Sequence, residues 1–225
     1  MDCTVRRQSS MRAYKSKVDL VYENLLSGIE NGVYEPGKRL VISQLAKDNE
    51  SSEIPVREAI RRLESEGYVE IQANKGPYVK AFDPEKAITI FQIKGVLEGY
   101  ASRLAIDYLT EADLDGLREL NTQMQACEEA GQNYSDLNQK FHLAIYQRLP
   151  QRELYDMICE LWKKWGITRS VFSMAPSMIP GSIKDHEHII QLLSEKDYDG
   201  VEQCVRAHKE KAGAVMSAYL RKRKE

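Results

Sequence analysis

The sequence predicts a mainly α-helical protein with an N-terminal winged helix-turn-helix and a C-terminal antiparallel all-α bundle of about six helices. Two observations predict this architecture. Residues 1–82 contain three short helical patterns followed by two strand patterns, which is the element order of a helix-turn-helix with a β-hairpin wing. Residues 84–222 contain only helical patterns with short connections, which is typical of an antiparallel bundle.

The first part begins with an amphipathic helix, because residues 17–31 place apolar side chains at helical spacing. Pro36 and Gly37 end that pattern and start a new run. Ser51 or Ser52 is suited to cap the third helix, and Gly67 is a natural left-handed stop for it. The predicted elements are helices over 17–31, 43–50 and 52–66, and strands over 68–72 and 77–82 joined by a turn with Gly76.

A domain boundary is predicted after residue 81, which gives a first domain over 14–81 and a second over 84–222. Asp83 is a good N-cap and Pro84 fits the first helical position, so a long helix opens here. Thr110 and Asp197 are suited to cap two later helices. The predicted helices span about 84–109, 111–130, 135–149, 152–173, 183–195 and 198–222, with a proline-containing loop over 175–182.

Composition excludes several classes of protein. The chain is 42% hydrophobic and 29% charged, as expected of a globular protein. It has no apolar run long enough to span a membrane, and its basic N-terminus lacks the apolar core of a secretory signal. Its four cysteines are far apart and form no C-x-x-C pair, which argues against a zinc ribbon and a disulfide framework and favours the cytoplasm.

The net charge of -2 does not by itself announce a nucleic-acid-binding protein, so a case for DNA depends on where particular charges lie. Residues 43–66 supply a short helix, a turn and a second helix. Arg57 and Arg61 lie one turn apart on the second helix, away from its apolar face, and Lys75 lies beside Gly76 at the wing tip. Guanidinium groups so placed can contact phosphates or guanine edges. The same spacing also fits a solvated charged face.

All four histidines lie in the second part of the chain. Asn138 and His142 share a helix face, whereas His186 and His188 are two residues apart, so only one can point inward. With His208 on the last helix, three histidines from three helices can converge inside a bundle and bind zinc, nickel, iron or copper. Ordinary surface or core histidines are the alternative.

Residues 21–79 resemble the winged helix of the GntR superfamily of bacterial regulators. The shared motifs are G-x-Y-x-P-G-x-x-L, Q-L-A, P-V-R-E-A-I-R-R-L-E-x-E-G-Y-V and the wing K-G-x-x-V. Glu53 stands where relatives often have an arginine that contacts DNA, and Ile54 stands where they often have a threonine. Glu53 could instead accept from a cytosine amino group, so the operator is expected to differ from theirs. The resemblance implies DNA contacts from Ser52, Glu53, Arg57, Arg61, Lys75 and Gly76.

The rest of the chain resembles, more loosely, the helical FCD effector domain of the FadR subfamily. The stretches NQKFH, DHEHIIQLLSEKD and VRAHKE occupy the places of that family's metal ligands, which selects His186 over His188. Asn138 replaces the usual aspartate, so the site lacks that negative charge. The implied cofactor is a divalent transition metal, zinc or nickel, bound by Asn138, His142, His186 and His208. Lys94 stands in place of a pocket arginine, and it and Arg169 are candidates to bind an anionic effector.

These features together predict a ligand-responsive DNA-binding regulator that senses a small carboxylate through the metal. A homodimer on a palindromic double-stranded operator is expected, because two-fold proteins match two-fold sites. No membrane partner is expected. Two alternatives stay open: a regulator for which the metal itself is the signal, and a metallohydrolase. The hydrolase is disfavoured because no carboxylate general base lies beside His142 in the sequence.

Overall fold

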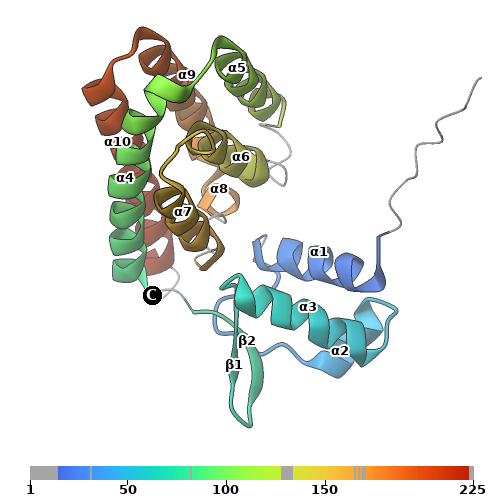
Figure 1. Ribbon diagram of the computed structural model, residues 1–225. Coiled ribbons are helices and arrows are strands. Elements are labelled where there is room, and N and C mark those ends of the chain that lie inside the picture. The colour runs from blue at the N-terminus through green and yellow to red at the C-terminus, as the bar shows by residue number, and fades with distance from the viewer. Residues whose placement is uncertain are drawn as a thin grey trace, which may run out of the picture.

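The computed structural model describes residues 15–30, 32–81, 83–127, 134–164, 166, 168 and 171–222. An N-terminal unit contains three helices and a hairpin, and a larger helical unit lies above it in Figure 1, with α4 leading from one into the other. This confirms the mainly helical class and the order of the two parts. No helix in the described part of the chain is long and apolar enough to cross a membrane.

The N-terminal unit consists of α1 (Lys17–Glu30), α2 (Ile42–Asp48), α3 (Glu53–Ser65), β1 (Val69–Gln72) and β2 (Gly76–Val79). β1 and β2 pair antiparallel, with Val69 opposite Val79 and Gln72 opposite Gly76. As predicted, Gly67 and Gly76 adopt positive φ angles of 79° and 94°, where a side chain would be strained. Ser52 occupies the N-cap position of α3, but its side chain makes no capping hydrogen bond.

The helical unit contains six long helices and a short one among the described residues. α4 and α10 form its most extensive pair, and α5 packs against α6 and α9. A Cβ at Gly99 on α4 would lie 2.8 Å from the carbonyl oxygen of Glu202 on α10, so glycine is needed for this close approach. The helices are α4 (Pro84–Ala105), α5 (Glu111–Ala126), α6 (Tyr134–Tyr146), α7 (Arg152–Lys164), α8 (Val171–Met174), α9 (Ile179–Glu195) and α10 (Tyr198–Lys222).

The predicted caps of the helical unit are present. Asp83 accepts a hydrogen bond from the Glu85 amide at the start of α4. Thr110 and Asp113 form a reciprocal capping box on α5, and Asp197 accepts from the Gly200 amide at the start of α10. These side chains satisfy amides that have no partner within their helices.

Two predictions for this unit are wrong. Residues 152–173 were expected to form one helix, but α7 ends at Lys164 and α8 is a separate short helix. Residues 175–182 were expected to form a loop, but a 3-10 turn over Pro176–Met178 leads directly into α9, which begins at Ile179. The second error arises because proline is tolerated in the first turn of a helix, where its missing N–H has no partner to lose.

Candidate metal centre and nucleic-acid interface

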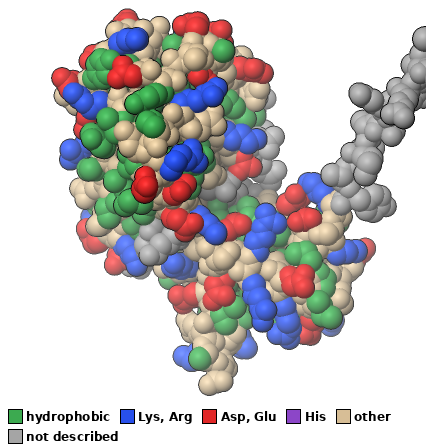
Figure 2. All heavy atoms as spheres, viewed as in Figure 1, with side chains coloured by type: hydrophobic (Ala, Val, Ile, Leu, Met, Phe, Trp, Pro, Cys, Tyr) green, Lys and Arg blue, Asp and Glu red, His purple; other side chains and the backbone are tan. Residues whose placement is uncertain are grey.

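The outer face of α3 is the candidate DNA-reading surface. Its apolar residues Val56, Ala59, Ile60 and Leu63 are buried against the rest of the N-terminal unit. Ser52, Glu53, Arg57 and Arg61 are exposed on the opposite face, as their spacing predicted. Lys and Arg side chains gather over α2 and α3 in Figure 2, interspersed with acidic groups.

Glu53 and Arg57 form an ion pair across one turn of α3, at 2.8 Å between Oε2 and Nη2. Both side chains are about half exposed, so the pair is worth little to stability. Its significance is positional, because the carboxylate holds the guanidinium along the helix. Arg57 would therefore approach a phosphate or a base edge with the Glu53 carboxylate beside it.

The wing adds basic groups beside α3. Lys75 is exposed in the turn between β1 and β2, next to Gly76. Arg39, which the sequence interpretation did not single out, forms a β-bridge with Tyr78 on β2. Its guanidinium lies 4.0 Å from where a Cβ of Gly76 would be. The basic dipeptide Lys38–Arg39 was visible in the sequence, but only the fold shows that it lies beside the wing.

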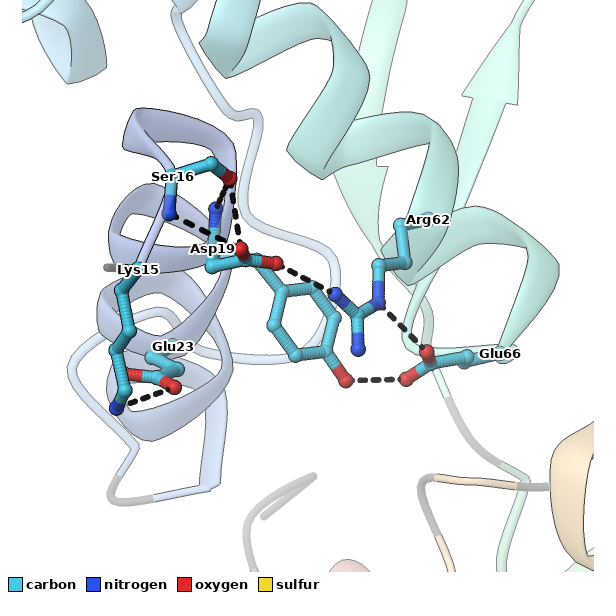
Figure 3. A network of polar contacts seen from close by, with 7 residues as sticks. Lys15, Ser16, Asp19, Glu23, Arg62 and Glu66 are labelled. Atoms are coloured by element: carbon cyan, nitrogen blue, oxygen red, sulfur yellow. Dashed lines mark hydrogen bonds and ion pairs between the residues drawn. The ribbon is translucent and has the colours of Figure 1, made fainter. Parts of the chain in front are cut away.

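Arg62, by contrast, is turned toward α1, although about half of its side chain is exposed. Its guanidinium lies 3.8 Å from the ring centre of Tyr22 and is paired with Asp19 on α1 and Glu66 after α3, each at 3.3 Å. The Tyr22 hydroxyl donates to the other carboxylate oxygen of Glu66. Figure 3 shows Asp19, Arg62 and Glu66 joined in one network. These contacts tie α1 to the carboxyl end of α3.

In the helical unit, the structure brings together His142 on α6, His186 on α9 and His208 on α10. Their ring centres are 5.1–5.3 Å apart, and one nitrogen from each lies within 4.8 Å of the others. All three are buried, whereas His188 is exposed, which agrees with the choice of His186 from the sequence. The family resemblance had selected His186, and the bundle brings the three rings together.

Outer contacts orient two of these rings. Nδ1 of His208 lies 3.1 Å from the Asp185 carboxylate, and Nδ1 of His186 lies 3.3 Å from Oδ1 of Asn121. Such partners select the ring tautomer and leave Nε2 free to face the cluster. Burial lowers the pKa of His142 and of His186 well below its ordinary value, and that of His208 less, because Asp185 opposes the effect. The rings are therefore neutral, as metal binding requires.

Several buried polar atoms in and beside the histidine cluster lack hydrogen-bond partners, and they fit a divalent cation. Both ring nitrogens of His142, Nε2 of His186 and Oδ1 of Asn138 are buried without a hydrogen-bond partner. A buried acceptor without a partner costs free energy, and neutral imidazoles with an amide oxygen form a donor set for zinc or nickel. His142, His186 and His208 would hold the metal with Asn138 beside them, and the metal would supply positive charge to which a carboxylate oxygen could bind.

Two buried lysines lie beside the histidines. Nζ of Lys94 on α4 donates to Oγ1 of Thr168 at 3.0 Å and lies 3.8 Å from the Trp162 ring centre. Nζ of Lys209 on α10 is paired with Glu98 on α4 at 2.9 Å and lies 4.7 Å from the same ring. The predicted anion-binding position Lys94 therefore faces the cluster region, whereas Arg169 lies outside the described residues.

A cavity of about 20 Å³ adjoins this cluster. It has room for about one water-sized group and is far below the roughly 300–1,000 Å³ of typical ligand pockets. In this conformation the site is closed to an organic acid. The lining residues are Phe91, Lys94, Ser135, Asn138, Trp162, Thr168, Val171, Phe172, His208, Lys209 and Ala212.

The sequence interpretation missed Lys209, Glu98, Asp185 and Trp162 in this region. Lys209 and Asp185 directly adjoin cluster histidines in the sequence, and that adjacency was the available signal. The sequence around Glu98 gave no such signal. Glutamate is almost never fully buried unless it is paired, so a buried position was not expected. Its partner is distant in the sequence and only the α4–α10 packing reveals it.

Comparison with known proteins assigns both parts. Residues 17–79 match the profile of bacterial regulatory proteins of the gntR family, and residues 89–211 match the FCD domain. The chain is 30% identical to the HTH-type transcriptional regulator McbR of Escherichia coli, over 82% of this chain and 86% of that protein. It is 26% identical to the Nta operon transcriptional regulator of Aminobacter aminovorans, over 84% and 93% of the two chains.

Solved structures show the same architecture. The structure of E. coli McbR/YncC aligns with a TM-score of 0.69 and 28% identity, over 94% of this chain and 100% of that chain. A transcriptional regulator from Rhodococcus sp. RHA1 aligns with a TM-score of 0.68 over 91% and 99% of the two chains. The latter is only 19% identical and supports the fold alone.

Proposed function

Because this chain belongs to the GntR family of bacterial regulatory proteins and carries an FCD domain, we propose that it is a ligand-responsive transcription regulator. Residues 14–81 form the DNA-binding domain and residues 84–222 the effector domain. The effector is a small carboxylate, and the bound metal, zinc or nickel, is the group it would contact. Such a regulator works in the cytoplasm, where the chromosome lies.

The metal-dependent part of the proposal is supported above all by the buried histidine cluster with its unpaired ring nitrogens. Asn138 supplies an amide oxygen but no charge, so the cluster would bind a dication less tightly than an aspartate-containing set. The nearby ammonium group of Lys94 favours an anionic effector, whereas that of Lys209 is paired with Glu98. Lys94 carries a point charge, whereas an arginine would offer two parallel N–H donors. Lys94 therefore attracts an anion without requiring a bidentate geometry.

The DNA-binding part is supported by the exposed face of α3 with Arg57 and Arg61, and by Lys75 at the wing. Ser52, Glu53 and Gly76 complete the proposed contact set. Glu53 would stay close to DNA through its pair with Arg57 and would discriminate among bases by accepting from a cytosine amino group. The operator itself is expected to be a palindromic duplex.

A homodimer is the proposed assembly. Regulators of this type bind operators typically as dimers. On α4, Ile93, Val96 and Tyr100 lie at helical spacing and are each about half exposed, and Figure 2 shows hydrophobic side chains over the face where α4 lies. A second copy that covers this stripe would remove it from water. Val96→Glu would then yield a monomer in sedimentation measurements, whereas a dimer in that variant would contradict the assignment of this face.

The test of DNA binding starts with operators selected by the whole protein from a random pool of duplexes. Arg57→Ala is expected to lower the affinity for the selected duplex by about 1–3 kcal/mol or more, because it removes a charged contact in the groove. Arg118→Ala on α5 is the control, since Arg118 is also exposed and paired with acidic groups but lies in the effector domain. Equal binding by Arg57→Ala and the parent protein would contradict the assignment.

The test of the metal site is the metal content of the purified protein by mass spectrometry, beside His142→Ala. Stoichiometric zinc or nickel that disappears in the variant is the expected result, and His188→Ala, which removes an exposed histidine, is the matched control. If the parent protein also binds no added zinc or nickel, the effector must be sought around the lysines alone.

Two alternative functions are distinguished by simple measurements. If the metal itself is the signal, added metal changes the affinity for DNA without any organic ligand. A metallohydrolase would need a carboxylate base near the cluster, but Asp185 is bound to His208 and Lys211, and Glu98 to Lys209. A turnover assay with simple esters and phosphates tests that alternative, and the relatives named above are regulators.

A further inference from the structure

The side chain of Trp162 separates a small cavity from a larger cleft. On one side it lines the small cavity beside Asn138 and His208. On the other it lines a cleft of about 340 Å³ between the two units, where Tyr22, Glu66 and Tyr68 of the N-terminal unit face α6 and α7. The ring is almost fully buried. A bound group that enlarges the small cavity would therefore move the Trp162 side chain toward the cleft, which has room for it.

The chain just after Trp162 contacts the end of α3. The Gly166 amide donates to the carbonyl oxygen of Glu66 at 3.0 Å, and Glu66 is the C-cap of α3. The approach is so close that a Cβ at Gly166 would lie 2.4 Å from that oxygen and 2.6 Å from the Tyr68 ring. No side chain fits there without a shift of one unit against the other.

Side-chain contacts lie on both sides of this hydrogen bond. On the effector side, Thr168 accepts from the buried Lys94 ammonium group. On the DNA-binding side, the Glu66 carboxylate is held by Tyr22 and Arg62, and through Arg62 by Asp19, as Figure 3 shows. A displacement of Gly166 would therefore act on the Glu66 contacts that join α1 to the end of α3.

From these contacts we propose that the Gly166–Glu66 hydrogen bond is the regulatory link between the effector cavity and α3. The inference rests on the proposed function. The cavity of about 20 Å³ is too small for an organic acid, so ligand binding must displace part of its wall. Displacement of Trp162 into the interdomain cleft breaks the Gly166–Glu66 contact and frees the carboxyl end of α3 to shift. Gly166 and Glu66 are positioning residues, since neither contacts the ligand or DNA.

The experiment fills the cavity without a ligand. Ala212 lines it from α10, and Ala212→Leu adds three carbon atoms there. Ala126→Leu adds the same atoms at an exposed position on α5 and is the control. Hydrogen exchange of the segment around Glu66 and Tyr68 is expected to become faster in Ala212→Leu and to stay unchanged in Ala126→Leu. The affinity for the selected duplex is expected to change by about 5- to 150-fold in the first variant only, the usual range of such couplings.

Gly166→Ala breaks the link directly, and Gly116→Ala is its control because a Cβ at Gly116 meets nothing within 4 Å. Gly166→Ala is expected to reproduce the exchange and affinity changes of Ala212→Leu, and the double variant to show no further change. If Ala212→Leu does not fold, Ser135→Thr adds a single methyl group to the same cavity.

Unchanged exchange at residues 64–68 in a folded cavity-filled variant would overturn the proposal, as would full additivity of the two substitutions. If the proposed function is wrong, the result is a different one: the parent protein binds no zinc or no selected duplex. Hydrogen exchange reports on the link in either case.

Discussion

Glu98→Gln provides the sharpest test of the energetics around the histidine cluster. The carboxylate of Glu98 and the ammonium group of Lys209 lie 2.9 Å apart with side-chain exposures of 1% and 4%. Coulomb's law at this distance gives about 6 kcal/mol at an effective dielectric constant of about 20, and about 1.4 kcal/mol in bulk water. Since breaking a buried pair leaves a buried charge without its partner, Glu98→Gln is expected to cost about 3–5 kcal/mol of the free energy of unfolding.

The same helix offers a matched control. Arg206 and Glu210 on α10 are also 2.9 Å apart, but their side chains are 57% and 42% exposed. Glu210→Gln is expected to cost about 0.3–0.5 kcal/mol, as measured for exposed pairs across one helical turn. Urea unfolding of the metal-free protein at pH 7 gives both values. Similar losses for the two variants would refute the argument that burial, and not distance, sets the strength of the pair.

A double-substitution cycle isolates the interaction energy between Glu98 and Lys209. Glu98→Gln with Lys209→Met removes both charges, and the free energy of unfolding is expected to return close to that of the parent protein. The loss in Glu98→Gln alone should also shrink at high pH. Burial lowers the pKa of Lys209 from its ordinary 10.5 and Glu98 opposes this, so without Glu98 the pKa falls further. Between that lowered pKa and 10.5 the unfolded state binds more protons, and stability rises with pH.

Three further predictions concern the cluster and the DNA-binding face. Asp185→Asn should lower zinc affinity about 10- to 100-fold, because it weakens the hydrogen bond that orients His208; a zinc titration against a chelator gives the value. The metal-free protein should lose stability as pH falls below about 6.5, since burial lowers the pKa of the cluster histidines and the unfolded chain then binds more protons; the slope is at most about 1.4 kcal/mol per pH unit for each histidine. Glu53→Gln should strengthen binding to non-selected DNA, because it removes a negative charge beside Arg57; a filter-binding assay over a range of salt concentrations measures it.

Each of these has a result that contradicts it. Unchanged zinc affinity in Asp185→Asn would mean that His208 is oriented by packing alone. Flat stability between pH 7 and 5 would mean that the histidines are hydrated and protonate in the folded state. Weaker binding of Glu53→Gln to every duplex would show that Glu53 positions Arg57 for DNA and does not repel phosphates.

Local sequence signals predicted the elements well where side-chain chemistry acts within one turn. Asp83 and Thr110 make the capping contacts that their positions suggested, and Gly67 has the positive φ expected of a helix stop. The break after Lys164 was missed although Gly166 was visible in the sequence, because the apolar spacing continues through it. The early start of α9 was missed because Pro180 was interpreted as a breaker and not as a first-turn residue.

The inner residues of the candidate site were predictable from the sequence, and its surroundings were not. Helix spacing and the family resemblance were enough to select His186 over His188. The buried Glu98–Lys209 pair and the contact of Gly166 with Glu66 join residues that are far apart in the sequence. Such contacts follow from tertiary packing, for which a single sequence carries no local pattern.

The pairing of α4 with α10 also sets the order in which the protein matures on the ribosome. The N-terminal unit leaves the ribosome first and can fold as a unit, whereas most of the buried face of α4 is covered only when the last long helix arrives. His208 and Lys209 arrive on that same helix. A translation product that stops before Tyr198 would therefore keep the helix-turn-helix and the wing, but lack the third histidine and expose an apolar face that quality-control proteases recognise.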